Sequence, residues 1–158
     1  MEKLIDWLPN NIPNNDITTI VHGDYRIDNL VFHKKAPKVI GVLDWEISTL
    51  GNPFADLAYH IMIWRLTKNQ FRGLKDINLK DFGIPSEEEH YKKYLNIMNL
   101  ENIPNWDFYI IYNMFRLAAI LQGIAGRARD GTASSPEAIR MDKLVKPIAD
   151  TAWLQVRK

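Results

Sequence analysis

The sequence predicts an α+β fold dominated by helices. Short runs of β-branched residues lie before residue 53, whereas helical patterns with recognisable start signals lie after it. The chain has 158 residues, of which 46% are hydrophobic, so it can bury a substantial core as one domain. We therefore expect a single domain over residues 1–158, with a β-loop-β region at 18–46 and a helical region at 53–158.

The first part of the chain is expected to hold a short helix and a small β-loop-β unit. Residues 1–7 have the pattern of a helix end, which Pro9 stops. Apolar, β-branched runs predict three strands, at 18–21, 30–32 and 39–43. The polar segment 33–37 separates the second strand from the third, which favours a hairpin.

The helices after residue 53 are predicted from their start signals. Asn52 before Pro53 supplies an N-cap and a proline at the first helical position. Ser86 with Glu89 three residues later forms a capping-box pattern. Together with the apolar periodicity, these signals predict helices at 54–64, 86 to about 99, 106–127 and from 135–136 to the C-terminus. The polar segment 66–84 is expected to form an irregular loop.

Composition narrows the possible functions. Twenty basic and 19 acidic residues give a net charge of +1, so we expect neither nucleic acid nor an anionic membrane as a partner. The absence of cysteine excludes disulfides and thiolate chemistry, and it favours a reducing, cytoplasmic location. The start of the chain lacks a signal-peptide pattern. Asn113, Arg116 and Gln122 interrupt the apolar stretch 108–126, which favours a buried helix over a membrane span.

Polar residues gather directly after two of the predicted strands. His22 and Asp24 follow the first strand, Asn29 comes five residues after Asp24, and Asp44 follows the third strand. Side chains at strand ends project from a rigid base into a loop, where catalytic groups are often placed. Phosphoryl transfer needs a carboxylate that orients the attacking hydroxyl and oxygen ligands that hold magnesium. An H-x-D-x-x-x-x-N pattern followed by a strand and an aspartate supplies these groups.

The spacing of His22, Asp24 and Asn29 matches the catalytic loop of protein kinases. With Gly23, it resembles the H-G-D-x-x-x-x-N loop of the aminoglycoside phosphotransferase and choline kinase superfamily. The runs 21–33, 42–53 and 56–59 are most similar to the kinase-like domain fused to some acyl-CoA dehydrogenases. This resemblance implies the C-terminal lobe of a protein-kinase-like fold, with a short β-hairpin at the catalytic loop. It also implies an ATP- and Mg²⁺-dependent phosphotransferase that acts on the hydroxyl of a small molecule.

The resemblance also implies roles for individual residues. Asp24 corresponds to the catalytic aspartate, and His22 to the histidine that orients the catalytic loop. Asn29 and Asp44 correspond to the residues that bind magnesium and, through it, ATP. Asp56 corresponds to a buried aspartate that braces the catalytic loop through backbone hydrogen bonds.

Plainer interpretations stay open for several residues. An aspartate after a strand is usually a turn or cap residue, and Asp56 could only complement a helix dipole. Asp28 and Glu46 are either indirect metal ligands or surface acids. Residues outside the cluster are expected to be structural: the surface or packing histidines His33, His60 and His90, the chance motif Asp81-Phe82-Gly83, and the core stripe Trp106, Ile110, Met114 and Leu117.

The sequence departs from the family pattern at its start. Only 21 residues precede His22 and none is glycine, so a glycine-rich phosphate loop has no counterpart there. Lys3 lies in a helical stretch and cannot be the strand lysine of a kinase. We therefore expect the C-terminal lobe alone, with the N-terminal ATP-binding lobe absent and negligible kinase activity. A homodimer is expected to cover the apolar surface left open, formed by Leu4, Ile5, Trp7, Ile40 and Val42.

Two other functions stay open. The first is a non-catalytic binding or assembly module that retains the kinase-like fold. The second is a metal-dependent phosphohydrolase that uses Asp24, Asp28 and Asp44, although that class commonly needs several histidine ligands. For a kinase, the resemblance favours a hydroxylated acyl thioester or acid as substrate, and an aminoglycoside second. The substrate contacts are expected from the helices after residue 85.

Overall fold

The computed structural model describes residues 1–15, 17–132 and 136–156. Its helices and strands, in chain order, are α1 (Glu2–Trp7), β1 (Thr19–Val21), β2 (Leu30–Phe32), β3 (Val39–Val42), β4 (Thr49–Gly51), α2 (Pro53–Ile61), α3 (Glu87–Met98), α4 (Trp106–Arg129) and α5 (Asp142–Val156). Single turns of 3₁₀ helix connect several of them. The predicted α+β class with dominant helices is confirmed.

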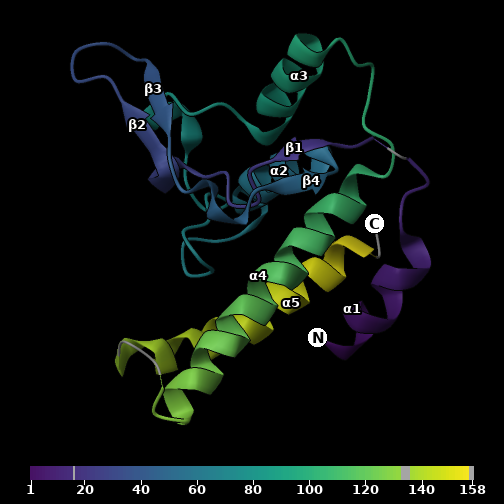
Figure 1. Ribbon diagram of the computed structural model, residues 1–158, viewed down its shortest axis with the longest axis vertical. Helices are drawn as coiled ribbons and strands as arrows, with labels where there is room; N and C mark the ends of the chain where they lie inside the picture. The colour runs from purple at the N-terminus through teal and green to yellow at the C-terminus, as the bar shows by residue number, and fades with distance from the viewer. Residues whose placement is uncertain (16, 133–135, 157–158) are drawn as a thin grey trace.

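The strands form two antiparallel ribbons (Figure 1). β2 pairs with β3 as the predicted hairpin, with Leu30 opposite Val42. β1 pairs with β4, with Val21 opposite Thr49. The sequence did not predict β4, because three residues carry no alternating pattern. The β1–β4 ribbon places the chain that leaves β1 next to the start of α2.

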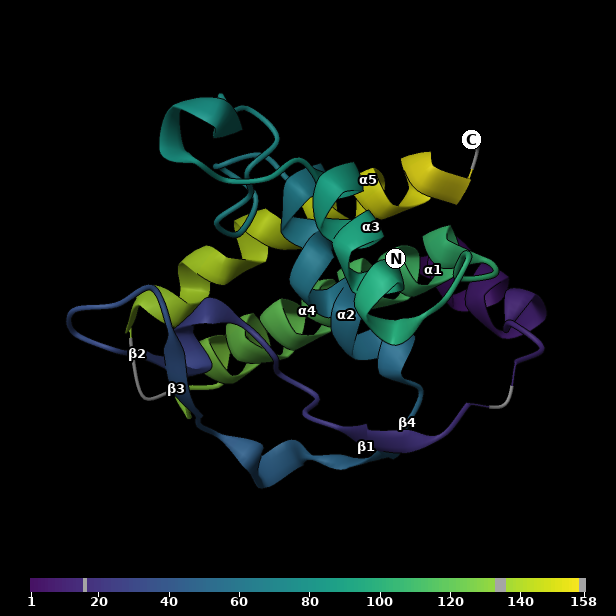
Figure 2. The ribbon, with the colours of Figure 1, turned by 90° about the horizontal axis from the view of Figure 1, so that it is seen from above.

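α4 is the central helix of the core. It packs along α5 on one side and against α2 on another (Figures 1 and 2). The predicted core stripe is confirmed, since Ile110, Met114 and Leu117 are at most 2% exposed and Trp106 packs against the core. By length and composition alone, α4 is also the one helix in the described ranges that could cross a membrane. Half of its most apolar stretch is buried inside the protein, as in a core helix.

Local capping contacts explain where α2 and α3 begin. The Phe54 N–H donates to Asn52 Oδ1 at 2.9 Å. Ser86 and Glu89 form the predicted capping box, with the two reciprocal hydrogen bonds at 3.2 and 2.8 Å. The predicted helix 54–64 is an α-helix only to Ile61 and then continues as a 3₁₀ turn. The last helix begins as a 3₁₀ turn at Pro136, while Ser135 lies outside the described residues.

The segment 66–84 is irregular, as predicted, apart from a 3₁₀ turn at Leu79–Phe82. The Asp81-Phe82-Gly83 motif lies on this turn, with no strand directly before it. Phe82 is 70% exposed. This environment differs from that of Asp44, which lies two residues after the end of β3. The literal motif thus lacks the structural context of a metal-binding loop.

The prediction of which apolar residues lie open was partly wrong. Leu4 is 1% exposed, because α1 packs into the core, and Trp7 and Val42 are only partly exposed. Ile5 and Ile40 are exposed, as expected. The open apolar side chains gather on the ribbons and their connections, and we call them the ribbon apolar residues: Ile20, Ile27, Val31, Phe32, Val39, Ile40, Leu43, Trp45, Ile47 and Leu50.

Candidate functional site

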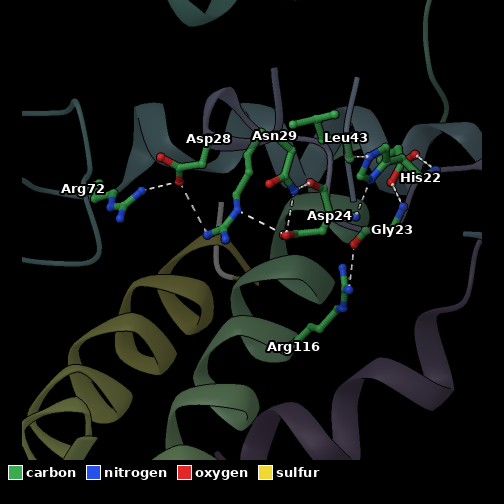
Figure 3. Close-up of polar contacts among 10 residues, drawn as sticks. His22, Gly23, Asp24, Asp28, Asn29, Leu43, Arg72 and Arg116 are labelled. Carbon is green, nitrogen blue, oxygen red and sulfur yellow. Dashed lines mark hydrogen bonds and ion pairs between the residues drawn. The ribbon is translucent and has the colours of Figure 1, made fainter. Parts of the chain in front are cut away.

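The loop that leaves β1, residues 22–29, brings two of the predicted site residues into contact. The Asn29 side-chain amide donates to Asp24 Oδ2 at 3.0 Å and to the Asp24 backbone carbonyl at 2.9 Å (Figure 3). Asn29 is only 8% exposed, whereas Asp24 is partly open to solvent. The five-residue spacing therefore closes a turn in which the amide holds the carboxylate in place.

His22 is buried, and both of its ring nitrogens are engaged. The Asp24 N–H donates to His22 Nδ1 at 3.2 Å, so Nδ1 is unprotonated in this arrangement. The proton is then on Nε2, which lies 2.8 Å from the Leu43 carbonyl oxygen and donates to it. His22 thus ties the backbone of Asp24 to the end of β3. The predicted orienting role of His22 is compatible with these two contacts.

Asp56, in the first turn of α2, accepts two backbone hydrogen bonds from the loop. The His22 N–H donates to Oδ2 at 2.5 Å and the Gly23 N–H donates to Oδ1 at 2.8 Å. Gly23 has a φ of 83°, and a Cβ at this position would lie 3.0 Å from the Ile47 carbonyl oxygen. Glycine is therefore required in the middle of the H-G-D motif, both by its backbone conformation and by this close contact.

Arg116 and Tyr59, neither of which the sequence assigned to the site, also contact the loop. Arg116 of α4 donates to the Gly23 carbonyl oxygen at 2.7 Å, and its guanidinium lies 5.1 Å from the centre of the Tyr59 ring. Burial, and then the nearby Asp24 carboxylate, raise the pKa of Tyr59 to about 12, so its hydroxyl stays protonated. The available signal was the single arginine in the apolar stretch of α4. Asn113, which also interrupts that stretch, donates to the Ala55 carbonyl oxygen at 2.9 Å and fixes α4 to α2.

A row of alternating charges extends from Asp24 to the irregular segment. Arg26 Nε lies 3.2 Å from Asp24 Oδ2, and Arg26 also pairs with Asp28 at 3.7 Å. Asp28 in turn pairs with Arg72 (Figure 3). Asp28 is therefore engaged by two arginines, while Glu46 lies exposed on the 3₁₀ turn after β3. Since the Arg72 and Asp28 side chains are 68% and 42% exposed, we expect little stability from their pair.

The backbone of Leu43, the residue before Asp44, is hydrogen-bonded to the loop 22–29. The Leu43 N–H donates to the Asn29 carbonyl oxygen at 2.8 Å, and the Leu43 carbonyl accepts from His22. Asp44 itself adopts the left-handed conformation, with φ 67°, and its side chain is exposed. Among the residues that the structure describes, no hydrogen bond or ion pair joins its carboxylate to Asp24 or Asn29. The loop and the end of β3 are thus joined, although the three side chains do not all touch.

The donor set fits magnesium. The Asn29 amide nitrogen is committed to Asp24, which leaves Oδ1 as a free acceptor within the described residues, and Asp44 presents an exposed carboxylate. Mg²⁺ prefers such oxygen donors and usually takes only one or two protein ligands, with phosphates and waters completing its shell. The described ranges hold no group of three or more histidine, cysteine or acidic residues that could bind a metal. The phosphohydrolase alternative, which needs such a group, gains no support.

A cavity of about 1130 Å³ lies beside the loop, where α2, α3, β1 and residues 80–85 meet. Tyr25, which follows Asp24, and the first turns of α2 form part of its wall. His60 and His90 also line it, with their rings 5.0 Å apart. Burial, and secondly the neighbouring His90, lower the pKa of His60 to about 4. These two histidines pack within the protein, whereas His33 lies exposed in the hairpin loop.

Comparisons with known proteins agree with this geometry. The profile of the phosphotransferase enzyme family matches residues 1–90. Acyl-CoA dehydrogenase family member 10 from Mus musculus is 46% identical over 155 residues, which cover 97% of this chain and 14% of that protein. Family member 11 from Homo sapiens is 38% identical over 160 residues, which cover 100% of this chain and 20% of that protein. The chain therefore spans a small part of these relatives.

A solved structure from Ralstonia eutropha JMP134, proposed to be an aminoglycoside phosphotransferase, superimposes with a TM-score of 0.92 at 46% identity. The match covers 99% of this chain and 48% of that one. The chain thus corresponds to about half of the solved protein, with the same fold throughout.

Proposed function

Because the chain belongs to the phosphotransferase enzyme family, we propose that it forms the catalytic lobe of an ATP-dependent kinase for a small hydroxylated substrate. The resemblance inferred from the motifs is confirmed by the family match, the acyl-CoA dehydrogenase relatives and the solved structure. The kinase-like fold is confirmed as well. The observation that carries the proposal is the contact between Asp24 and Asn29, held in place by His22 and Asp56.

We propose that Asp24 receives the acceptor hydroxyl. Asn29 and Arg26 both contact Oδ2, and the Tyr59 hydroxyl also hydrogen-bonds to the Asp24 carboxylate. A carboxylate has about four acceptor positions, so we assign the incoming hydroxyl to one that these contacts leave open. A hydrogen bond there would direct the hydroxyl oxygen toward the transferring phosphoryl group and provide a place for its proton. Asp56 and Arg116 hold the backbone on either side of Gly23, which limits how far Asp24 can move.

Asn29 and Asp44 are the residues that would hold magnesium. When bound, the ion neutralises charge on the phosphates of ATP. The groups that cradle the phosphates are proposed to come from a second lobe, because the chain covers only 48% of the solved neighbour. On this view, the chain provides the acceptor side of the reaction and needs another lobe for efficient transfer.

The names of the similar proteins suggest two classes of substrate. Relatives named acyl-CoA dehydrogenase family members favour a hydroxylated acyl thioester or acid. The solved neighbour, proposed to be an aminoglycoside phosphotransferase, makes aminoglycosides the second candidate. The alternative function is a non-catalytic assembly module. The exposed ribbon apolar residues favour this alternative, because exposed apolar patches commonly mark docking surfaces.

The test is a transfer assay on this chain and on a longer homologue that contains the same motifs. The substrates are a hydroxyacyl thioester, a hydroxy acid, an aminoglycoside and choline, with ATP and Mg²⁺. In the homologue, the equivalent of Asp24→Ala should lower transfer by at least about 100-fold, as expected for loss of a positioned acid–base group. The equivalent of Asp44→Ala should weaken the dependence on Mg²⁺.

Asp81→Ala, in the chance Asp-Phe-Gly motif, is the matched control and should leave transfer unchanged. Equal losses from the Asp24 and Asp81 variants would contradict the assignment of the site. Absence of transfer to every small molecule, in both proteins, would favour the assembly module. Phosphorylation confined to protein substrates would overturn the small-molecule proposal.

A further inference from the structure

We propose that Arg26 is a further catalytic residue, whose guanidinium binds the phosphoryl group while it passes to the acceptor hydroxyl beside Asp24. This proposal rests on the proposed kinase function and adds to it the side chain that meets the transferred group. Arg26 Nε lies 3.2 Å from Asp24 Oδ2. Among the residues that the structure describes, no other cationic side chain forms an ion pair with Asp24.

The backbone of Arg26 is held by the same turn that holds Asp24. Arg26 is extended, with φ −153° and ψ 165°, and its carbonyl oxygen accepts from the Asn29 N–H at 3.0 Å. The Asn29 side chain donates at the same time to Asp24. One asparagine therefore positions both the carboxylate and the arginine, which keeps the guanidinium beside Asp24.

The guanidinium of Arg26 has donors to spare, since an arginine side chain carries five N–H groups. Its Nε is shielded from solvent and yet forms no hydrogen bond within the described residues, and its Nη1 lies 3.7 Å from Asp28, beyond hydrogen-bond distance. A buried donor without a hydrogen bond is uncommon, and a catalytic role or a bound ion often explains it. The Asp24 and Asp28 carboxylates still balance the local charge, so Arg26 offers a phosphoryl group directed hydrogen bonds and no excess of positive charge.

The other two arginines near the loop are engaged elsewhere. Arg116 donates to the Gly23 carbonyl oxygen at 2.7 Å and stacks on the Tyr59 ring. Arg72 reaches the outer carboxylate, that of Asp28 (Figure 3). Neither of them contacts the carboxylate to which we assign the acceptor hydroxyl. The position next to the reacting oxygen thus belongs to Arg26.

The chemistry of transfer gives this position its use. The acceptor hydroxyl gives its proton to the Asp24 carboxylate, and its oxygen forms a bond to the γ-phosphorus of ATP. The bond from that phosphorus to the β–γ bridging oxygen breaks, and its electron pair leaves on ADP. In the transition state, negative charge is spread over the three equatorial oxygens of the phosphoryl group. Because the hydroxyl and Arg26 contact the same carboxylate, these oxygens lie within reach of the guanidinium, whose planar donors match phosphate geometry.

The kinetic test uses a two-lobed homologue with arginine at this position. The equivalent of Arg26→Ala should lower kcat at least about 100-fold and change the KM of the acceptor less than about threefold, as expected for an interaction made in the transition state. Arg26→Lys should lose about tenfold, because an ammonium keeps the charge but not the planar donors. Added guanidinium ion should restore part of the activity of Arg26→Ala and none of that of Asp24→Ala. Arg72→Ala, which removes the other arginine paired with Asp28, is the matched control and should leave kcat unchanged.

A binding test uses this chain and does not depend on catalysis. Inorganic phosphate is titrated into the chain while the Nε–H signals of the arginines are followed by NMR. Phosphate should shift the signal of Arg26 and leave that of Arg72 in place. Thermal unfolding of both alanine variants shows whether each substitution preserves the fold.

Equal losses of kcat from the Arg26 and Arg72 substitutions would overturn the proposal, since they would show that pairing with Asp28 is all that matters. A loss in Arg26→Ala that accompanies unfolding and is not rescued by guanidinium ion would overturn it too. If no homologue transfers phosphate to any hydroxyl compound while phosphate still shifts the Arg26 signal, the proposed function fails and the phosphate-binding role stands. If transfer occurs but the equivalent of Arg26→Ala leaves kcat unchanged, this inference fails alone.

Discussion

Asp56 satisfies two backbone amides of the loop 22–29 with a single carboxylate. One oxygen accepts from His22 and the other from Gly23, at 2.5 and 2.8 Å. Hydrogen bonds to a charged acceptor are worth about 1.5 to 3 kcal/mol each, and an amide left unpaired costs a similar amount. The conformation of the loop around Asp24 therefore depends on a residue that need not touch substrate.

Asp56→Asn should destabilise the protein, because an asparagine side chain presents one acceptor and turns an N–H group toward the second amide. The expected loss of unfolding free energy is about 2 to 3 kcal/mol, measured by urea denaturation. Hydrogen exchange at the Gly23 amide should accelerate more than exchange in α5. Asp76→Asn, at an exposed loop position, is the control and should change little. An unchanged Gly23 exchange rate would contradict the bracing role.

Stability should fall on acidification because of His60. Burial, and secondly His90, hold the pKa of His60 at about 4, whereas an unfolded histidine titrates near 6.5. The unfolded chain binds this proton more readily, so the contribution of neutral His60 is complete above about pH 6.5 and is lost as the pH falls toward 4. Through His60 alone, the free energy of unfolding should change by at most about 1.4 kcal/mol per pH unit. Burial also lowers the pKa of His90, so this residue should add to the loss of stability at low pH.

The measurement is urea denaturation at several values between about pH 4 and pH 7. His60→Gln should flatten the pH dependence, whereas His33→Gln, in the exposed hairpin loop, should preserve it. Equal slopes in the His60 variant and the original protein would refute this origin of acid sensitivity.

At the scale of elements, Arg65 joins helices that are distant in sequence. It lies at the end of the 3₁₀ turn that follows α2, and its guanidinium contacts Glu87 of α3 at 2.7 Å, Asp107 of α4 at 2.5 Å and Gln155 of α5 at 3.2 Å. The side chain is only 18% exposed. Burial alone would lower the pKa of Arg65, but these carboxylates raise it, so the charge is always present.

Arg65→Lys should destabilise the protein by about 1 to 3 kcal/mol, because a single ammonium cannot reach acceptors on three helices. A double-mutant cycle with Glu87→Gln, read by thermal or urea unfolding, measures the coupling. The control is Lys92→Met, which removes an exposed pair on α3 and should cost less than about 0.5 kcal/mol. Additive effects of the Arg65 and Glu87 substitutions would contradict the proposed clamp.

Elements defined by local contacts could be predicted from the sequence, and those defined by distant contacts could not. Asn52 and Ser86 cap their helices through residues two or three positions away, so both helix starts were predictable. β4 is a strand only because β1 pairs with it. The same distinction holds at the site, where the Asp24–Asn29 contact follows from spacing along one loop. The contact from Arg116 to Gly23 crosses the fold, and periodicity cannot reveal it.

At the scale of the whole molecule, the β1–β4 ribbon presents apolar side chains to solvent. Ile20 and Leu50 are opposite each other in the ribbon and are 73% and 71% exposed. Cross-strand pairs point to the same face of a ribbon, so these two form a continuous apolar surface. Such surfaces commonly mark sites of association.

We predict that the chain self-associates through this surface. Sedimentation and light scattering should show a concentration-dependent dimer, and Ile20→Lys with Leu50→Lys should shift it to monomer without loss of helical signal. Leu154→Lys, at an exposed position on α5, is the control and should leave the dimer intact. A monomer at all concentrations, or a dimer unaffected by the ribbon substitutions, would contradict the prediction.

The first and last helices lie next to each other. α1 contacts α5, and the Lys3 ammonium lies 5.6 Å from the centre of the Trp153 ring (Figure 1). The described contacts of Asp24, by contrast, come from its own loop and from α2. The contact between α1 and α5 therefore does not involve the side chain of Asp24. A substitution that loosens the packing of α1 on α5 should leave the groups that hold this carboxylate in place.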